Sequence, residues 1–75
     1  MAWTQEQLAG VIEQNEAWLL SQAGVVGVGV GLDRDGNACV EVLTDDVSPD
    51  VRRSVEMRLN RVPLVFTNTG TIEAL

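Results

Sequence analysis

The chain has 75 residues, a formal net charge of −6 and no histidine. A chain of this length has room for one hydrophobic core, so residues 1–75 are expected to form a single domain of modest stability. Its 11 acidic side chains against 5 basic ones repel phosphate backbones and anionic lipid head groups. Nucleic acid and membrane surfaces are therefore not expected partners.

The residues that carry catalysis and metal binding are scarce. The single cysteine, Cys39, excludes an internal disulfide, and the lack of histidine removes the commonest metal ligand and general base. Without a base to activate it, Cys39 is expected to be a small apolar filler on a strand. The sequence therefore predicts no enzyme, no catalytic residue, no metal site and no cofactor.

The N-terminus shows no signal-peptide pattern, and no stretch reaches the roughly 18 to 20 apolar residues that a membrane-spanning helix needs. The expected location is the cytoplasm, which agrees with a lone reduced cysteine.

The first helix is predicted to start at Thr4, because Thr4 and Gln7 have the spacing of a capping box. Gly24 is predicted to be its left-handed C-terminal cap. The inward side of this helix is expected to be a stripe at helical spacing, made of Leu8, Val11, Ile12, Asn15, Trp18, Leu19 and Gln22.

A β-hairpin follows, with strands at residues 25–32 and 38–44 and a turn that contains Asp35-Gly36. Side chains alternate across a strand, so one set should face the helices: Val26, Val28, Val30 and Leu32. The other set, Val25, Gly27, Gly29 and Gly31, should form a stripe of nearly bare backbone. On the second strand this stripe is expected to be flanked by Cys39, Glu41 and Leu43.

A second helix is predicted from Ser48, which can act as N-cap, with Pro49 in the first helical position and an end near Asn60. Its inner line is Val51, Val55 and Leu59, and its arginines, Arg52, Arg53, Arg58 and Arg61, are expected to form a solvated face. A third strand should start at Leu64, with a bend at residues 68–70 before another extended piece.

The order helix, strand, strand, helix, strand predicts an α+β fold, a three-stranded sheet with two helices on one face. This is a ferredoxin-like unit lacking one strand. The right-handed crossover makes the third strand parallel to the second. The third strand can lie beside the second strand or on the far side of the first; the latter is favoured, which puts residues 25–32 in the middle.

Two familiar motifs are ruled out by their spacing. Residues 27–31 lack the G-x-G-x-x-G pattern between a strand and a helix that dinucleotide binding requires. Residues 33–37 look like part of a calcium loop, but neither register of that loop supplies its glutamate at position twelve.

Several segments together resemble the small α/β segment that precedes trypsin-like serine peptidase domains in some bacterial proteins. These segments are an apolar helix, Gly24-Val25-Val26-Gly27-Val28-Gly29-Val30-Gly31, an apolar strand, Val62-Pro63-Leu64-Val65, and Gly70-Thr71-Ile72-Glu73-Ala74-Leu75. No catalytic triad residue falls in the matching stretch. The resemblance implies an accessory or interaction module, with a peptidase as a partner in trans.

The glycine stripe calls for a compensating contact, because each glycine in a strand costs roughly 0.5 to 1 kcal/mol relative to alanine. Strand twist or a close approach of the chain's own C-terminal segment would explain it, and so would a second chain packed on the stripe. The leading hypothesis is a module that self-associates through its open sheet face or a sheet edge. The predicted interface residues are Val25, Gly27, Gly29, Gly31, Cys39, Glu41, Leu43 and Trp3. The alternative is a small-ligand-binding regulatory domain of ferredoxin-like type.

Overall fold

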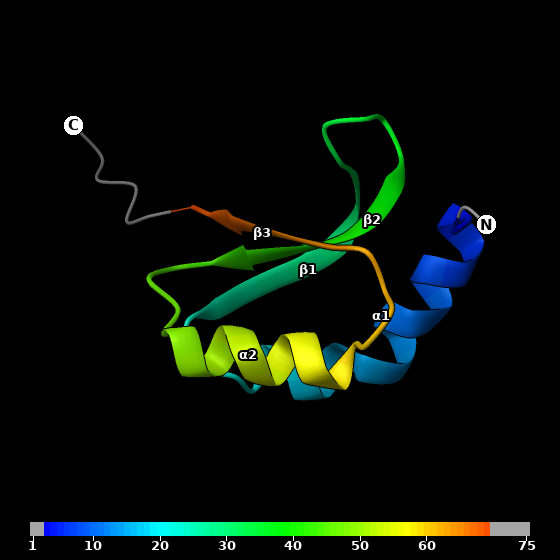
Figure 1. Ribbon diagram of the computed structural model, residues 1–75. Coiled ribbons are helices and arrows are strands. Elements are labelled where there is room, and N and C mark those ends of the chain that lie inside the picture. Colours follow the sequence, from blue (N-terminus) through cyan, green and yellow to red (C-terminus); the bar gives the residue numbers. More distant parts are fainter. Residues whose placement is uncertain (1–2, 70–75) are drawn as a thin grey trace.

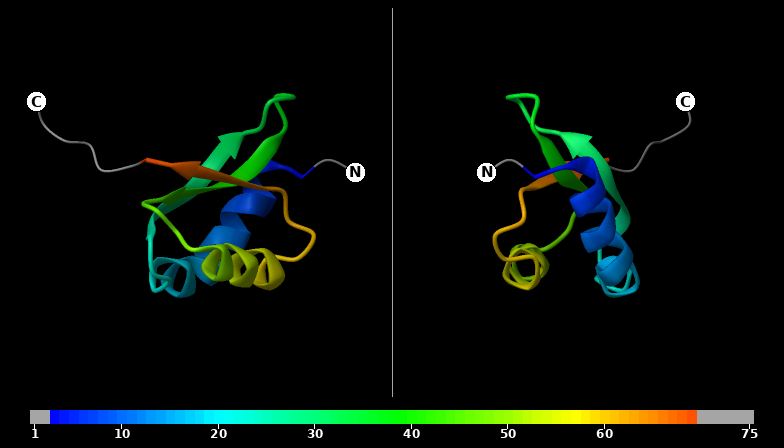
Figure 2. Two further views of the ribbon diagram at one scale, coloured as in Figure 1. Left: turned by 60° about the vertical axis from the view of Figure 1, so that its left-hand side comes forward. Right: turned by 90° about the vertical axis from the view of Figure 1, so that its right-hand side faces the viewer.

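The computed structural model describes residues 3–69, and the predicted extended piece after Gly70 lies outside them. The elements are α1 (Gln5–Leu20), β1 (Val25–Leu32), β2 (Ala38–Thr44), α2 (Pro49–Arg58) and β3 (Leu64–Asn68). Both helices lie on one face of the sheet (Figures 1 and 2). The predicted α+β fold and its element order are confirmed. Within residues 3–69, no helix has the length and apolar character needed to cross a membrane.

The two helix starts are confirmed by their capping hydrogen bonds. The Gln7 amide donates to Thr4 Oγ1 at 3.1 Å and the Thr4 amide donates to Gln7 Oε1 at 2.9 Å, which completes the capping box. Ser48 Oγ accepts from the Val51 amide at 3.2 Å. These polar groups satisfy donors that the first turn of a helix otherwise leaves without partners.

Gly24 is not the cap of α1. The helix ends at Leu20, with Ser21 as a right-handed C-cap. Gly24 lies three residues further on with φ +88°, where the chain turns into β1. Its carbonyl accepts from the Asp45 amide at 2.7 Å, so it joins the start of β1 to the segment after β2.

The strand order is β1-β2-β3, with β1 antiparallel and β3 parallel to β2. The prediction that the Val/Gly strand lies in the middle is therefore wrong. The reason is burial on both faces of β2: Cys39 on one face, and Val40, Val42 and Thr44 on the other, are each at most 2% exposed. Strands that are buried on both faces are typical of the centre of a sheet, whereas β1 keeps exposed side chains and takes an edge.

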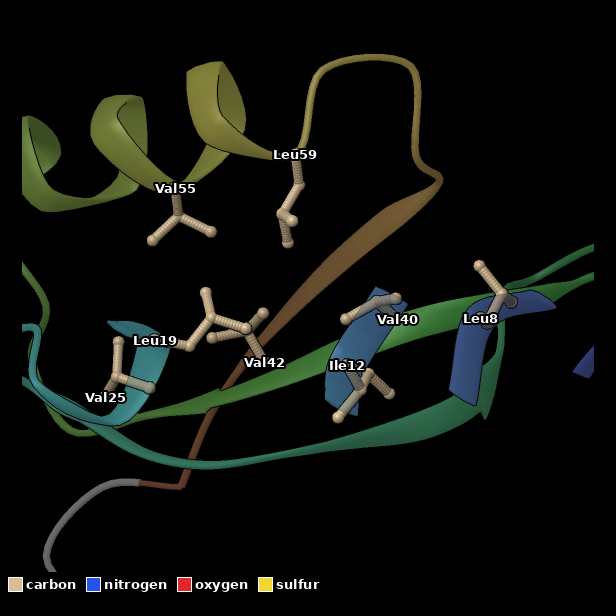
Figure 3. Packing of buried hydrophobic residues seen from close by; sticks show 8 residues of the cluster. All are labelled: Leu8, Ile12, Leu19, Val25, Val40, Val42, Val55 and Leu59. Atoms are coloured by element: carbon tan, nitrogen blue, oxygen red, sulfur yellow. The ribbon is translucent and has the colours of Figure 1, made fainter. Parts of the chain in front are cut away.

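The core lies between the sheet and the two helices (Figure 3). The predicted stripe of α1 supplies Leu8, Ile12 and Leu19, which are buried, with Val11 and Trp18 packed against them. The remaining buried members are Val25, Val40, Val42, Val55 and Leu59. A core this small leaves each of its side chains with a large share of the domain's stability.

Two arginines of α2 pack on aromatic rings, which the sequence did not predict. The Arg58 guanidinium lies 4.5 Å from the centre of the Trp18 ring, and its Nε donates to Asn15 Oδ1 at 3.0 Å. Arg52 covers Phe66 of β3 at 4.8 Å. All four predicted arginines are exposed, but these two also hold α2 to α1 and to β3 through cation–π contacts.

Candidate interaction surface

A β-bulge near the start of β1 reverses the faces expected for its first two residues. Val25 pairs with Thr44 and Gly27 with Leu43, so Val26 is an extra residue with no partner in β2. Val25 is consequently buried in the core at 7% exposure, while Val26 is 57% exposed. The prediction that Val25 belongs to an interface is therefore wrong.

Beyond the bulge, the side chains alternate as predicted. Val28, Val30 and Leu32 lie opposite Val42, Val40 and Ala38 on the helix side of the sheet. Gly27, Gly29 and Gly31 lie opposite Leu43, Glu41 and Cys39 on the open side. The tip of the hairpin extends away from both helices (Figure 2), and on the helix side near it Val30 is 38% and Leu32 65% exposed.

Neighbouring side chains of β2 account for two of the three glycines. A Cβ at Gly27 would lie 3.2 Å from Leu43 Cδ1, and one at Gly31 would lie 3.3 Å from Glu41 Cβ. Gly29 has nothing within 4 Å of that position. The fold itself therefore explains why Gly27 and Gly31 are small, and Gly29 is the one without an explanation inside the described chain.

Glu41 is tied into the sheet rather than free on its surface. Thr67 Oγ1 donates to Glu41 Oε2 at 3.0 Å, which links β2 to β3 across the open face. Glu41 and Leu43 are both half-buried. The open face thus offers less exposed surface than the sequence predicted.

Of the two remaining predicted interface residues, Cys39 is not available to a partner, and Trp3 is partly covered by the core. Cys39 is 1% exposed, and burial, followed by the charges of Asp33 and Glu41, raises the pKa of its thiol. A buried, protonated thiol is a poor nucleophile. Trp3 is half-buried and packs against the core.

The exposed apolar surface gathers on β1. Five large hydrophobic side chains are exposed among the described residues, and three of them, Val26, Val30 and Leu32, belong to this strand; the others are Leu20 and Met57. Sequence reasoning missed these three because it assigned them to a face covered by helices. A signal was present in the sequence: the strand continues to Leu32 with no charged residue along it.

A hollow of about 210 Å³ lies where β2 and β3 end, and its lining includes Thr44, Arg52 and Phe66. Within residues 3–69, no buried side-chain nitrogen or oxygen lacks a hydrogen-bond partner. No cluster of acidic or cysteine side chains in that part of the chain could hold a metal ion. The ligand-binding alternative therefore stays a prediction.

The fold places the chain in the α+β class, with a mixed three-stranded sheet layered on two helices. Comparisons with protein-family models, with curated proteins and with solved structures found no match to it.

Proposed function

We propose that this chain is a non-enzymatic interaction module that self-associates through the outer edge of β1. The observation that carries the proposal is that this edge is unpaired and unprotected. Within residues 3–69, β1 pairs only with β2, and its eight residues include no charge and no proline. Proteins that stay monomeric protect such edges with charges, proline or a covering segment.

The backbone groups that face outward can be identified from the hydrogen bonds of β2. The Val40 amide donates to the Pro63 carbonyl and the Thr44 carbonyl accepts from the Thr69 amide, both at 2.8 Å, so the even-numbered residues of β2 point toward β3. The odd-numbered ones point toward β1, and their partners there are the three glycines. The N–H and C=O groups of Val28 and Val30 therefore point outward from the free edge of β1, in the plane of the sheet and away from β2.

Association through this edge would also bury the exposed side chains of Val30 and Leu32. Moving such a side chain from full exposure to full burial contributes about 1.5–3 kcal/mol. Val30 is 38% and Leu32 65% exposed in the single chain, so each can contribute a part of that range. The open face offers a weaker interface, because its residues are already half-buried and Glu41 adds a charge. We further propose an accessory role for the assembled module, which is what the sequence resemblance to segments that precede trypsin-like peptidase domains implies.

A matched pair of lysine substitutions tests the proposal. Val30→Lys places a charge on the β1 edge, and Val65→Lys places the same charge on the open face of β3, where Val65 lies opposite Glu41. Light scattering over a concentration series should show a dimer for the wild type and for Val65→Lys. Val30→Lys should weaken the dimer at least tenfold.

Two results would count against the edge. A wild-type chain that remains monomeric throughout the concentration series would overturn self-association. A dimer that survives Val30→Lys but is lost in Val65→Lys would move the interface to the open face.

A further inference from the structure

We infer that two copies of this chain pair β1 with β1, antiparallel, about a two-fold axis that passes through Gly29. This inference rests on the proposed function and specifies its partner and its register. The sequence Val26-Gly27-Val28-Gly29-Val30-Gly31-Leu32 reads alike in both directions from Gly29: valine beside it on each side, then glycine, then a large apolar residue. Two-fold antiparallel pairing places each residue opposite its mirror image in the sequence.

The backbone satisfies this register. Val28 and Val30 carry the outward N–H and C=O groups, so Val28 and the partner's Val30 can exchange both hydrogen bonds, and the symmetric pair does the same. Gly29 then faces the partner's Gly29 in a non-hydrogen-bonded pair, where Cα atoms approach to about 4.5 Å. Nothing lies within 4 Å of a Cβ position at Gly29, so the open face of the sheet is unobstructed beside this pair.

The side chains favour the same register. With Gly29 on the axis, Val26 lies opposite the partner's Leu32 and Gly27 opposite the partner's Gly31. Residues 26–32 then pair without a charge among them, and the partner's Asp33 falls just beyond, opposite Val25 at the start of β1. Moving the axis to Val30 would put Gly27 opposite the partner's Asp33. Moving it to Val28 would bring the bulge at Val25–Gly27 from the end of the paired stretch to the positions next to the axis.

Paired residues share a face of the sheet, so the helices of both copies would lie on the same side. The two three-stranded sheets would join into one continuous sheet. The exposed apolar side chains of β1 would meet apolar side chains across the junction: Val26 would lie opposite the partner's Leu32, and Val30 opposite the partner's Val28.

Cysteine cross-linking tests the register. In a Cys39→Ala background, Gly29→Cys should form a covalent dimer on mild oxidation, because only a residue on the axis meets its own copy within disulfide reach. Leu32→Cys is the control: it is 65% exposed, but the two copies would be about 20 Å apart, six residues along paired strands. Non-reducing gels and intact mass would show the products, and light scattering in reductant would show the non-covalent state.

The outcomes separate the register from the proposed function. Covalent dimer from Gly29→Cys and none from Leu32→Cys supports the inference. If the reduced chains are dimeric but Gly29→Cys does not cross-link, the register is wrong and self-association stands. If wild type and Cys39→Ala are both monomeric at every concentration, both proposals are overturned. Should Cys39→Ala fail to fold, the same variants in the wild-type background serve, because Cys39 is buried.

Discussion

Replacing Leu19 by alanine is expected to lower the free energy of unfolding by about 2–5 kcal/mol, the range for deleting a buried leucine side chain. Leu19 is fully buried, at 0% exposure, and belongs to the same buried cluster as Val25 and Val42 (Figure 3). Small domains have stabilities near the lower end of the usual 5–15 kcal/mol. The variant should therefore be largely unfolded or on the verge of unfolding, as followed by urea denaturation with far-UV circular dichroism.

The neighbouring residue provides the control for this substitution. Leu20 precedes the C-cap of α1 and is 45% exposed. Leu20→Ala makes the same chemical change in the same helical turn, and we expect an effect within about 0.5 kcal/mol, as for most surface substitutions. Equal losses from the two variants would contradict the described orientation of α1 on the sheet.

Gly24→Ala is expected to cost about 1–3 kcal/mol, the range for holding a residue in an unfavourable backbone conformation. Two features add up at this position. Its φ of +88° disfavours any residue with a Cβ, and that Cβ would lie 2.9 Å from Val47 Cα, which is backbone and cannot swing aside. The Asp45 amide donates a hydrogen bond to the Gly24 carbonyl. Any backbone shift that relieves the contact between the new Cβ and Val47 would strain this hydrogen bond.

Two other glycines separate these contributions. Gly36 has φ +81° with nothing within 4 Å, so Gly36→Ala should show the effect of the backbone angle without the contact. Gly10 lies inside α1 with open space around it, so Gly10→Ala should raise stability by about 0.5–1 kcal/mol. Chemical denaturation of the three variants should rank Gly24→Ala lowest. A Gly24→Ala variant as stable as Gly36→Ala would contradict the close approach of Val47.

The features of this fold that sequence predicts are those decided by neighbouring residues. Thr4 with Gln7, and Ser48 with Pro49, mark helix starts because a cap needs only a side-chain oxygen and the amides of the next turn. Strand order depends on contacts between distant segments. The pattern of β2, which is apolar on both faces at Cys39 and Val40, was the available signal that it lies in the centre.

The sequence predicted that the Val/Gly strand carries the candidate site, but it assigned Val25 and Val26 to the wrong faces. Val25 and Val26 are identical residues, so the sequence contains nothing to show which of them occupies the bulge, and a slip of one residue exchanges the faces. The stacking of Arg58 on Trp18 depends on how the two helices lie, which no spacing within either helix determines. The role of β1 as an uncharged edge, in contrast, follows from its composition once its position is known.

Backbone amide hydrogen exchange, measured by NMR, tests the central claim most directly. The Val28 and Val30 amides point outward, while the Gly29 amide between them points toward β2, so Gly29 serves as an internal control. In concentrated wild-type protein, the amides of Val28, Val30 and Gly29 should all exchange slowly. Dilution should speed up the exchange of the two valine amides and leave the Gly29 amide protected. Val28 and Val30 amides that exchange as fast as unpaired amides at every concentration, while Gly29 stays protected, would contradict pairing through the β1 edge.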